Sequence, residues 1–136
     1  MDVADLVGVP FVDRGRDKSG FDCWGLCLEV FKRYGIALPD YQICCSDVTA
    51  AFSQFSITSS AWDSHGVDCI PVPAIVAIRF DYRYPDMVTH VGTYIGDGKF
   101  IHTREKIGSC VERIDSPAWR HRIAGFYTPP QMEVLT

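Results

Sequence analysis

Cys23, His90 and His102 are the residues whose types and spacing could carry out nucleophilic catalysis. A cysteine nucleophile needs a base within hydrogen-bonding reach and a third group that orients this base. Cys23 follows Asp22 at the start of a helical pattern, and the two histidines stand twelve positions apart in a strand-rich region. An imidazolium about 4 Å from a thiolate supplies up to ~4 kcal/mol at an effective dielectric constant of ~20, against ~0.3–1 kcal/mol for a helix dipole. We therefore expect a histidine to activate the thiol, with the helix end assisting.

Each of these residues also has a purely structural interpretation. A buried cysteine at a helix start commonly serves as a small hydrophobe. A histidine in a strand is commonly a polar residue whose hydrogen bonds are satisfied. The chemical interpretation therefore depends on whether the fold brings the three side chains together.

The segment that follows Asp22 has the periodicity of an amphipathic helix. Its apolar positions form one continuous stripe, made of Cys23, Leu26, Cys27, Val30, Phe31 and Tyr34. Asp22 is a favoured N-cap, and Gly35 is a typical helix stop. The pattern places Cys23 in the first turn, where backbone N–H groups could also receive an oxyanion. Cys27 lies one turn deeper and is interpreted as a packing residue.

Strands dominate the second half of the chain. The β-branched and aromatic-rich runs cover residues 74–80, 88–95, 99–103, 110–114 and 122–128. Helices followed by a run of strands predict an α+β fold, with the helices packed on an antiparallel sheet of about five strands.

Two further helices are predicted in the first half. A short leading helix ends at Gly8, and a second helix covers residues 46–55 with Ser46 or Asp47 as its cap. Residues 57–73 are predicted to be irregular.

The turn at Gly96-Asp97-Gly98 decides whether the two histidines can meet. With a two-residue loop, residue 93 opposes 102 and the histidines lie on opposite faces of the sheet. With a three-residue loop, or with a bulge of the same parity, residue 92 opposes 102 and they become diagonal neighbours on one face. Two glycines around an aspartate suit the three-residue loop. We therefore expect a histidine pair whose face meets the start of the Cys23 helix.

The composition is that of one globular domain over residues 1–136, with 47% hydrophobic and 22% charged residues. A formal net charge of -4 gives no electrostatic case for nucleic acid, and no apolar run approaches the roughly 18 residues of a membrane span.

The acidic N-terminus lacks the basic and apolar regions of a secretory signal, so we expect none. We accordingly expect reduced thiols and no cofactor or metal. The alternative is a zinc or iron–sulfur site built from Cys44, Cys45, Cys69 and Cys110.

Three stretches, "GFDCWGL", "YGIALPD" and "THVGTYIGDGKFIH", resemble the NlpC/P60 family of papain-like cell-wall peptidases. The resemblance runs from about Gly8 to Phe126. It implies Cys23 as nucleophile, His90 as general base and acid, and His102 as the residue that orients His90. It also implies that the substrate is the peptide stem of peptidoglycan, commonly cut between D-glutamate and a diamino acid.

The tryptophan in "DCWGL", the lead-in "GVPFVDRGRDKSG" and the closing "AWRHRIAGFYTP" are similar to the branch found in phage tail-tip proteins. This implies tail-tip proteins as partners, and a location in the virion tail or in the host cytoplasm during assembly. A structural tail subunit without catalysis is the alternative, and an amidase or acyltransferase acting on a lipid or other amide is a third. Phe11 stands where family members often carry a tyrosine that assists the oxyanion.

Overall fold

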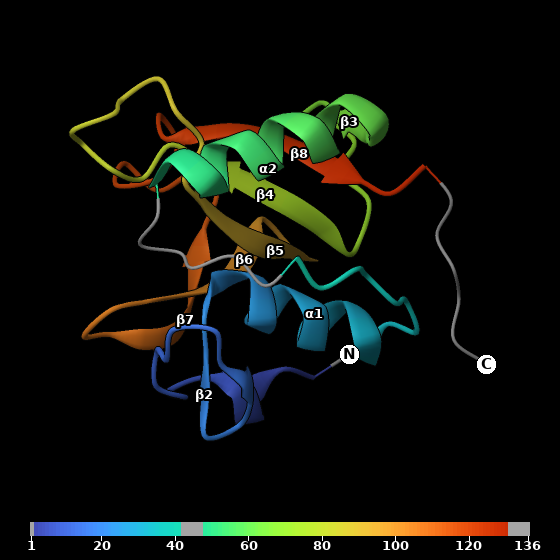
Figure 1. Ribbon diagram of the computed structural model, residues 1–136. Helices are drawn as coiled ribbons and strands as arrows, with labels where there is room; N and C mark the ends of the chain where they lie inside the picture. Colours follow the sequence, from blue (N-terminus) through green and yellow to red (C-terminus); the bar gives the residue numbers. More distant parts are fainter. Residues whose placement is uncertain (1, 42–47, 131–136) are drawn as a thin grey trace.

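The computed structural model describes residues 2–41 and 48–130, in which two α-helices pack on an antiparallel sheet (Figure 1). Along the chain the elements are η1 (Ala4–Leu6), β1 (Arg16–Asp17), β2 (Gly20–Phe21), α1 (Cys23–Arg33), α2 (Val48–Ala61), β3 (Asp63–His65), β4 (Ala74–Ile78), β5 (His90–Gly96), β6 (Lys99–Arg104), β7 (Gly108–Arg113) and β8 (Ile123–Thr128). Strands β1 and β2 pair with each other, and the others form one sheet in the order β3-β8-β4-β5-β6-β7. All pairs within this sheet are antiparallel. The predicted α+β class is confirmed.

The five predicted strands correspond to β4 through β8, with small differences at their ends. Within the described residues the main sheet has six strands instead of about five, because β3 pairs with β8 at one edge. Strand β3 is only three residues long, and its sequence Asp-Ser-His has no apolar alternation. A strand this short and polar carries no periodic signal that sequence analysis can detect.

Helix α1 begins and ends as predicted. The Asp22 carboxylate accepts a hydrogen bond from the Gly25 N–H at 2.7 Å, which is the N-cap geometry. Tyr34 is the C-cap, and Gly35 follows with a φ of 81°, the left-handed conformation that glycine favours after a helix. Cys23 therefore lies in the first turn of α1.

Gly25 lets α1 approach the preceding loop closely. A Cβ atom built on Gly25 would lie 2.1 Å from the carbonyl oxygen of Gly15. No side chain fits at that distance, so glycine is required here despite its low helix propensity. The close contact fixes the start of α1 against the loop that leads to Asp22.

The second helix is longer than the prediction. Helix α2 continues to Ala61, so the prediction that residues 57–73 are irregular is wrong for the end of α2 and for β3. The last turns are rich in serine and threonine, which are weak helix formers. Packing sustains the helix, because Phe55 contacts Tyr127 of β8 edge to face with ring centroids 5.6 Å apart. The expected caps Ser46 and Asp47 lie outside the described residues. The leading helix is a single 3-10 turn, η1, followed by Gly8 with a φ of 87°.

Different groups of side chains pack on the two faces of the main sheet. Helix α1 packs on one face, where Cys27 and Phe31 cluster with Ile75 and Val91. The other face carries a second cluster, made of Val76, Ile78, Phe100, Trp119 and Phe126. Since side chains alternate along a strand, the face of Phe100 also carries the two histidines. The body of α1 therefore covers the face opposite to the one that carries the histidine pair.

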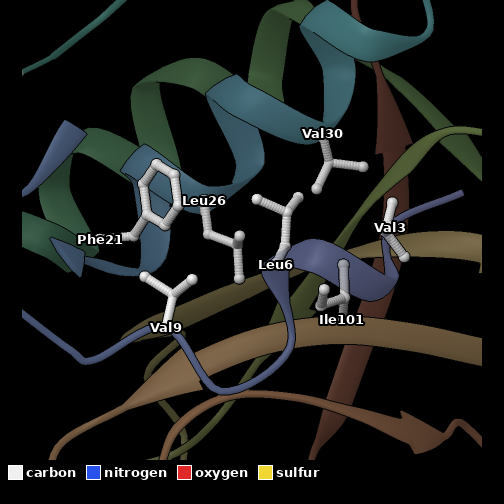
Figure 2. Packing of buried hydrophobic residues seen from close by; sticks show 7 residues of the cluster. All are labelled: Val3, Leu6, Val9, Phe21, Leu26, Val30 and Ile101. Carbon is white, nitrogen blue, oxygen red and sulfur yellow. The ribbon is translucent and has the colours of Figure 1, made fainter. Parts of the chain in front are cut away.

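The N-terminal segment completes the core between α1 and β6. Figure 2 shows Leu6 of η1 between Val30 of α1 and Ile101 of β6, with Val3, Val9, Phe21 and Leu26 around them. Leu6, Val30 and Ile101 are fully buried. The segment is tied to β7 by hydrogen bonds from the Gly8 N–H to the Ser109 carbonyl and from the Ser109 N–H to the Val9 carbonyl.

Neither the described part of α1 nor that of α2 is long and apolar enough to cross a bilayer.

Candidate active site

The hairpin between β5 and β6 determines which way the histidines face. It turns at Asp97 and Gly98, whose φ angles of 55° and 73° suit a two-residue type I′ turn. Just before the turn, the pairing shifts by one residue between Tyr94 and Gly96, which marks a β-bulge. A two-residue turn alone would put the histidines on opposite faces, and the bulge restores the parity that puts them on one. The three-residue loop favoured from the sequence is thus wrong, while the bulge of the same parity is confirmed.

His90 and His102 form a buried hydrogen-bonded pair. His90 Nε2 lies 2.8 Å from His102 Nδ1, and the ring centroids are 5.1 Å apart. His90 is 6% exposed and His102 is 1% exposed. The expected contact between the two histidines is therefore present.

Glu112 of β7 extends this pair. Its Oε2 lies 2.8 Å from His102 Nε2, so both ring nitrogens of His102 are engaged. The sequence predicts residues 110–114 only as a strand, and no pattern in it marks Glu112. Its approach depends on the register of β6 and β7, in which His102 pairs with Cys110 and Phe100 pairs with Glu112. Nothing local in the sequence specifies that register.

The three groups define a direction for the hydrogen-bond chain. An ionised carboxylate can only accept, so His102 Nε2–H donates to Glu112. In a neutral His102 the Nδ1 atom is then an acceptor, and His90 Nε2–H donates to it. The remaining ring nitrogen of a neutral His90, Nδ1, consequently carries no proton. That is the form in which a histidine can act as a base.

Aromatic rings enclose the histidine pair. The ring of Phe80 lies 5.0 Å from that of His90, and the ring of Trp119 lies 4.7 Å from that of His102 at 86°. Burial lowers the pKa of His90 well below its ordinary value, and the neighbouring His102 adds to this effect. Burial also lowers the pKa of His102, while its hydrogen bond to Glu112 opposes the shift. The enclosure therefore favours neutral imidazoles. No local pattern in the sequence marks Phe80 or Trp119 as neighbours of the site.

Cys23 and His90 line the same pocket, which is open to solvent. Cys23 comes from the first turn of α1 and is 9% exposed, and His90 is the first residue of β5. Although the body of α1 and the histidine pair lie on opposite faces of the sheet, Cys23 and His90 both line this pocket. His102 stands behind His90 and is absent from the described pocket lining.

The wall of this pocket is mostly aromatic, aliphatic or neutral and polar. Trp24 has its ring centroid 5.4 Å from that of Tyr41 and 6.4 Å from that of Trp62. Helix α2 supplies a second wall. The described lining residues are Asp22, Cys23, Trp24, Tyr41, Gln54, Phe55, Thr58, Ser59, Trp62, Ile75, Val88, Thr89, His90, Val91 and Tyr127. No lysine or arginine is among them.

Charged groups hold the start of α1 in place. The buried Asp22 carboxylate accepts from Arg16 Nη1 at 2.7 Å, in addition to capping α1. Arg16 in turn binds both carboxylate oxygens of Asp40 through Nε at 2.8 Å and Nη2 at 2.9 Å. The Arg14 N–H also donates to Asp22 at 3.1 Å. The residue before Cys23 is thus fixed from three directions.

The cysteines differ in their surroundings. Among the described residues, Cys23, Cys27, Cys69 and Cys110 form no disulfide, and Cys44 and Cys45 lie outside the described residues. Burial raises the pKa of Cys27 to about 12, which agrees with its interpretation as a packing residue. The alternative metal site that included Cys44 and Cys45 therefore falls partly outside the described residues.

The chain is similar to known peptidases in sequence. The sequence model of the NlpC/P60 family matches residues 8–69. A "probable endopeptidase" of Mycobacterium tuberculosis is 31% identical over 97 residues, which are 71% of this chain and 20% of that protein. The murein DD-endopeptidase MepS/murein LD-carboxypeptidase of Escherichia coli K12 is 26% identical over 120 residues, which are 88% of this chain and 55% of that protein. The chain thus spans a fifth to about half the length of these relatives.

Solved structures of NlpC/P60 domains have a similar fold. An NlpC/P60 family protein of Bacillus cereus superimposes with a TM-score of 0.66 at 23% identity, covering 90% of this chain and 36% of that one. At this identity the likeness concerns the fold alone. The predicted papain-like NlpC fold is confirmed.

Proposed function

Because the chain belongs to the NlpC/P60 family, we propose that it hydrolyses an amide bond in the peptide stem of bacterial peptidoglycan. Cys23 is the nucleophile, His90 the general base and acid, and His102 the residue that orients His90. One observation carries this proposal above the others. Cys23 and His90 line one pocket, while the second nitrogen of His90 is held by His102.

The reaction begins with proton transfer from the Cys23 thiol to His90 Nδ1. The sulfur attacks the carbonyl carbon of the scissile amide, and the electron pair of the C=O bond moves to its oxygen. Backbone N–H groups at the start of α1 stabilise this oxyanion. Phe11 has no hydroxyl with which to assist.

The tetrahedral species collapses to a thioester as the C–N bond breaks. The leaving amine takes the proton from His90 Nδ1, which returns His90 to its neutral form. Water then attacks the thioester carbonyl while His90 accepts one of its protons. Breaking the C–S bond releases the carboxylic acid, and the proton on His90 returns to the Cys23 sulfur.

The direct test uses purified peptidoglycan and measures the release of new amino termini. We expect release by the wild-type protein and none above background by Cys23→Ser or His90→Ala. His102→Ala should keep a reduced rate, because an orienting group tunes the base without replacing it. Circular dichroism of each variant confirms that it is folded. Equal release by wild type and Cys23→Ser would overturn the peptidase and favour the structural tail subunit.

We further propose that the protein works with phage tail-tip proteins, in the virion tail or in the host cytoplasm during assembly. The support is the resemblance of its tryptophan-containing motif and its closing segment to that branch. In the structure this tryptophan, Trp24, donates its indole N–H to the Pro39 carbonyl at 2.8 Å and lines the pocket. Mass spectrometry of purified particles should find the protein in the tail fraction or, during infection, bound to tail proteins. Its absence from both would contradict the tail proposal without affecting the peptidase.

A further inference from the structure

Three side chains that can bind metals meet behind the catalytic pair. His102 of β6 pairs directly with Cys110 of β7, and Glu112 lies two residues further along β7 on the same face. One ligand atom from each, an imidazole nitrogen, a sulfur and a carboxylate oxygen, lies within 4.8 Å of the other two. His102 Nε2 and Glu112 Oε2 are already 2.8 Å apart. The described part of the chain holds this one group of its kind.

The three groups suit zinc in type and placement. Zinc binds thiolate, imidazole and carboxylate ligands at about 2.0–2.3 Å, usually in a tetrahedron whose ligand atoms are about 3.3–3.8 Å apart. Cys110 and Glu112 are only partly buried, so their side chains can rotate and an ion can reach them. A thiolate and a carboxylate supply two negative charges. Arg104 carries a positive charge near His102 that repels a bound cation and weakens its binding. The Arg104 guanidinium lies 5.4 Å from the centroid of the Trp119 ring.

We propose that His102, Cys110 and Glu112 form a zinc-binding site with solvent as the fourth ligand, and that zinc bound there switches off the catalytic histidine. The binding itself does not depend on the peptidase activity. The switch rests on the proposed function.

The switch follows from the direction of the hydrogen-bond chain. Zinc on His102 Nε2 replaces the proton there, so neutral His102 carries its proton on Nδ1 and donates to His90 Nε2. Neutral His90 then carries its proton on Nδ1 and cannot accept one from Cys23. The two histidines hold the same number of protons as before. Cys110 loses its thiol proton, so one proton is released for each zinc bound.

Binding is tested with Co²⁺ as a spectroscopic substitute for zinc in the Cys23→Ala variant. This variant removes the rival site that zinc could form with Cys23 and His90. We expect a thiolate-to-cobalt charge-transfer band that saturates at one equivalent and disappears when Zn²⁺ is added, because thiolate ligation favours zinc. The double variant Cys23→Ala/Cys110→Ser should lose the band and bind Zn²⁺ more than about 100-fold more weakly, since removing a ligand costs more than removing an outer-shell partner.

The matched control is Cys23→Ala/Cys69→Ser, which removes an exposed cysteine away from the cluster and should keep the band. A band that survives Cys110→Ser would place the metal elsewhere, for example on Cys44 or Cys45, and would overturn the proposal. No band in Cys23→Ala would overturn it as well.

The switch is tested by the ratio of rates with and without Zn²⁺ for each protein. We expect Zn²⁺ to lower the rate of amino-terminus release by the wild type at least tenfold, and a chelator to restore it. In Cys110→Ser the same Zn²⁺ concentration should change the rate less than twofold. Equal inhibition of both proteins would assign the effect to Cys23 and His90 and overturn the switch. A protein with no activity but with the cobalt band would contradict the proposed function and leave the zinc site standing.

Discussion

At the scale of single residues, the chain from Glu112 through His102 to His90 explains how a buried histidine can be a base. The aromatic enclosure favours neutral rings, and a neutral ring has one protonated and one bare nitrogen. Glu112 determines which nitrogen is bare on both rings, because its carboxylate only accepts. Glu112, which is absent from the described pocket lining, thus sets which nitrogen of His90 carries a proton.

The first prediction concerns this positioning role. Glu112→Ala should lower kcat by about tenfold or more, because His102 can then adopt either tautomer. Glu112→Gln should keep most of the rate, since its amide oxygen can still accept from His102 Nε2–H. The measurement is the rate of amino-terminus release, with Glu105→Gln in the exposed turn after β6 as the control. If the Gln and Ala variants are equally impaired, Glu112 acts through its charge and not through the tautomer.

The second prediction concerns Cys27, whose pKa burial raises to about 12. Folding therefore favours the protonated thiol, and the free energy of unfolding should fall as the pH rises from the ordinary thiol pKa of about 8.5 toward 12. The slope from this group is at most about 1.4 kcal/mol per pH unit. Urea unfolding at pH 7, 9 and 10 should show a smaller alkaline loss for Cys27→Ala than for wild type. Cys69→Ser, an exposed cysteine, should match wild type, and identical losses in all three proteins would contradict the assignment.

At the scale of elements, the start of α1 is built by contacts that leave no freedom to the residues around Cys23. Asp22 caps the helix and pairs with Arg16, and Gly25 touches the backbone of the preceding loop. The "DC-x-G" part of the motif is therefore a structural requirement, because the neighbours of Cys23 in sequence fix its position.

The third prediction tests this placement through Gly25→Ala. In an exposed helix this change stabilises by about 1 kcal/mol. Here the new Cβ would lie 2.1 Å from the Gly15 oxygen, so the helix start or the loop must move. We expect a net loss of about 2 kcal/mol or more in urea unfolding, with a lower rate of catalysis.

The matched control for this change is Gly66→Ala, where a Cβ would meet nothing within 4 Å. It should change the free energy of unfolding by less than about 1 kcal/mol. Equal effects of the two substitutions would show that the close approach at Gly15 does not constrain α1.

At the scale of the whole molecule, the N-terminal segment is a structural part of the domain. Residues of η1 fill the space between α1 and β6, and the segment hydrogen-bonds to β7 (Figure 2). The segment therefore supports the helix that carries Cys23. Stability and catalysis should therefore respond together to changes in this core.

The fourth prediction compares two neighbouring residues of that segment. Leu6 is fully buried and Val7 is 49% exposed. Leu6→Ala should lower the free energy of unfolding by about 2–5 kcal/mol through lost burial and a cavity. Val7→Ala should lower it by less than about 1 kcal/mol. A small effect of Leu6→Ala in urea unfolding would show that η1 contributes little to the fold.

Local patterns in the sequence predicted much of this architecture. The apolar stripe from Cys23 to Tyr34 predicts α1 and both of its ends correctly, because capping and periodicity involve residues close in sequence. The face that carries both histidines was predictable for the same reason. The sequence favours a three-residue loop between β5 and β6, whereas the structure reaches the same parity with a two-residue turn and a bulge.

Contacts between distant elements were not predictable in this way. Glu112 depends on the pairing of β6 with β7, and Trp119 reaches His102 from the segment before β8. The side of the sheet that α1 covers also depends on packing of the whole molecule. Short polar strands such as β3 have no pattern of their own.

The wall of the pocket has a consequence for which chemical groups it can admit. Its described residues include no cation, and they include the carboxylate of Asp22. A substrate carboxylate that entered would lose its water to aromatic and aliphatic neighbours, which costs several kcal/mol and exceeds what one hydrogen bond returns. We expect substrates to enter with their uncharged groups inward while their ionised groups stay hydrated at the mouth. The pocket would then discriminate between substrates by the cost of removing water from their charged groups, before any bond is broken.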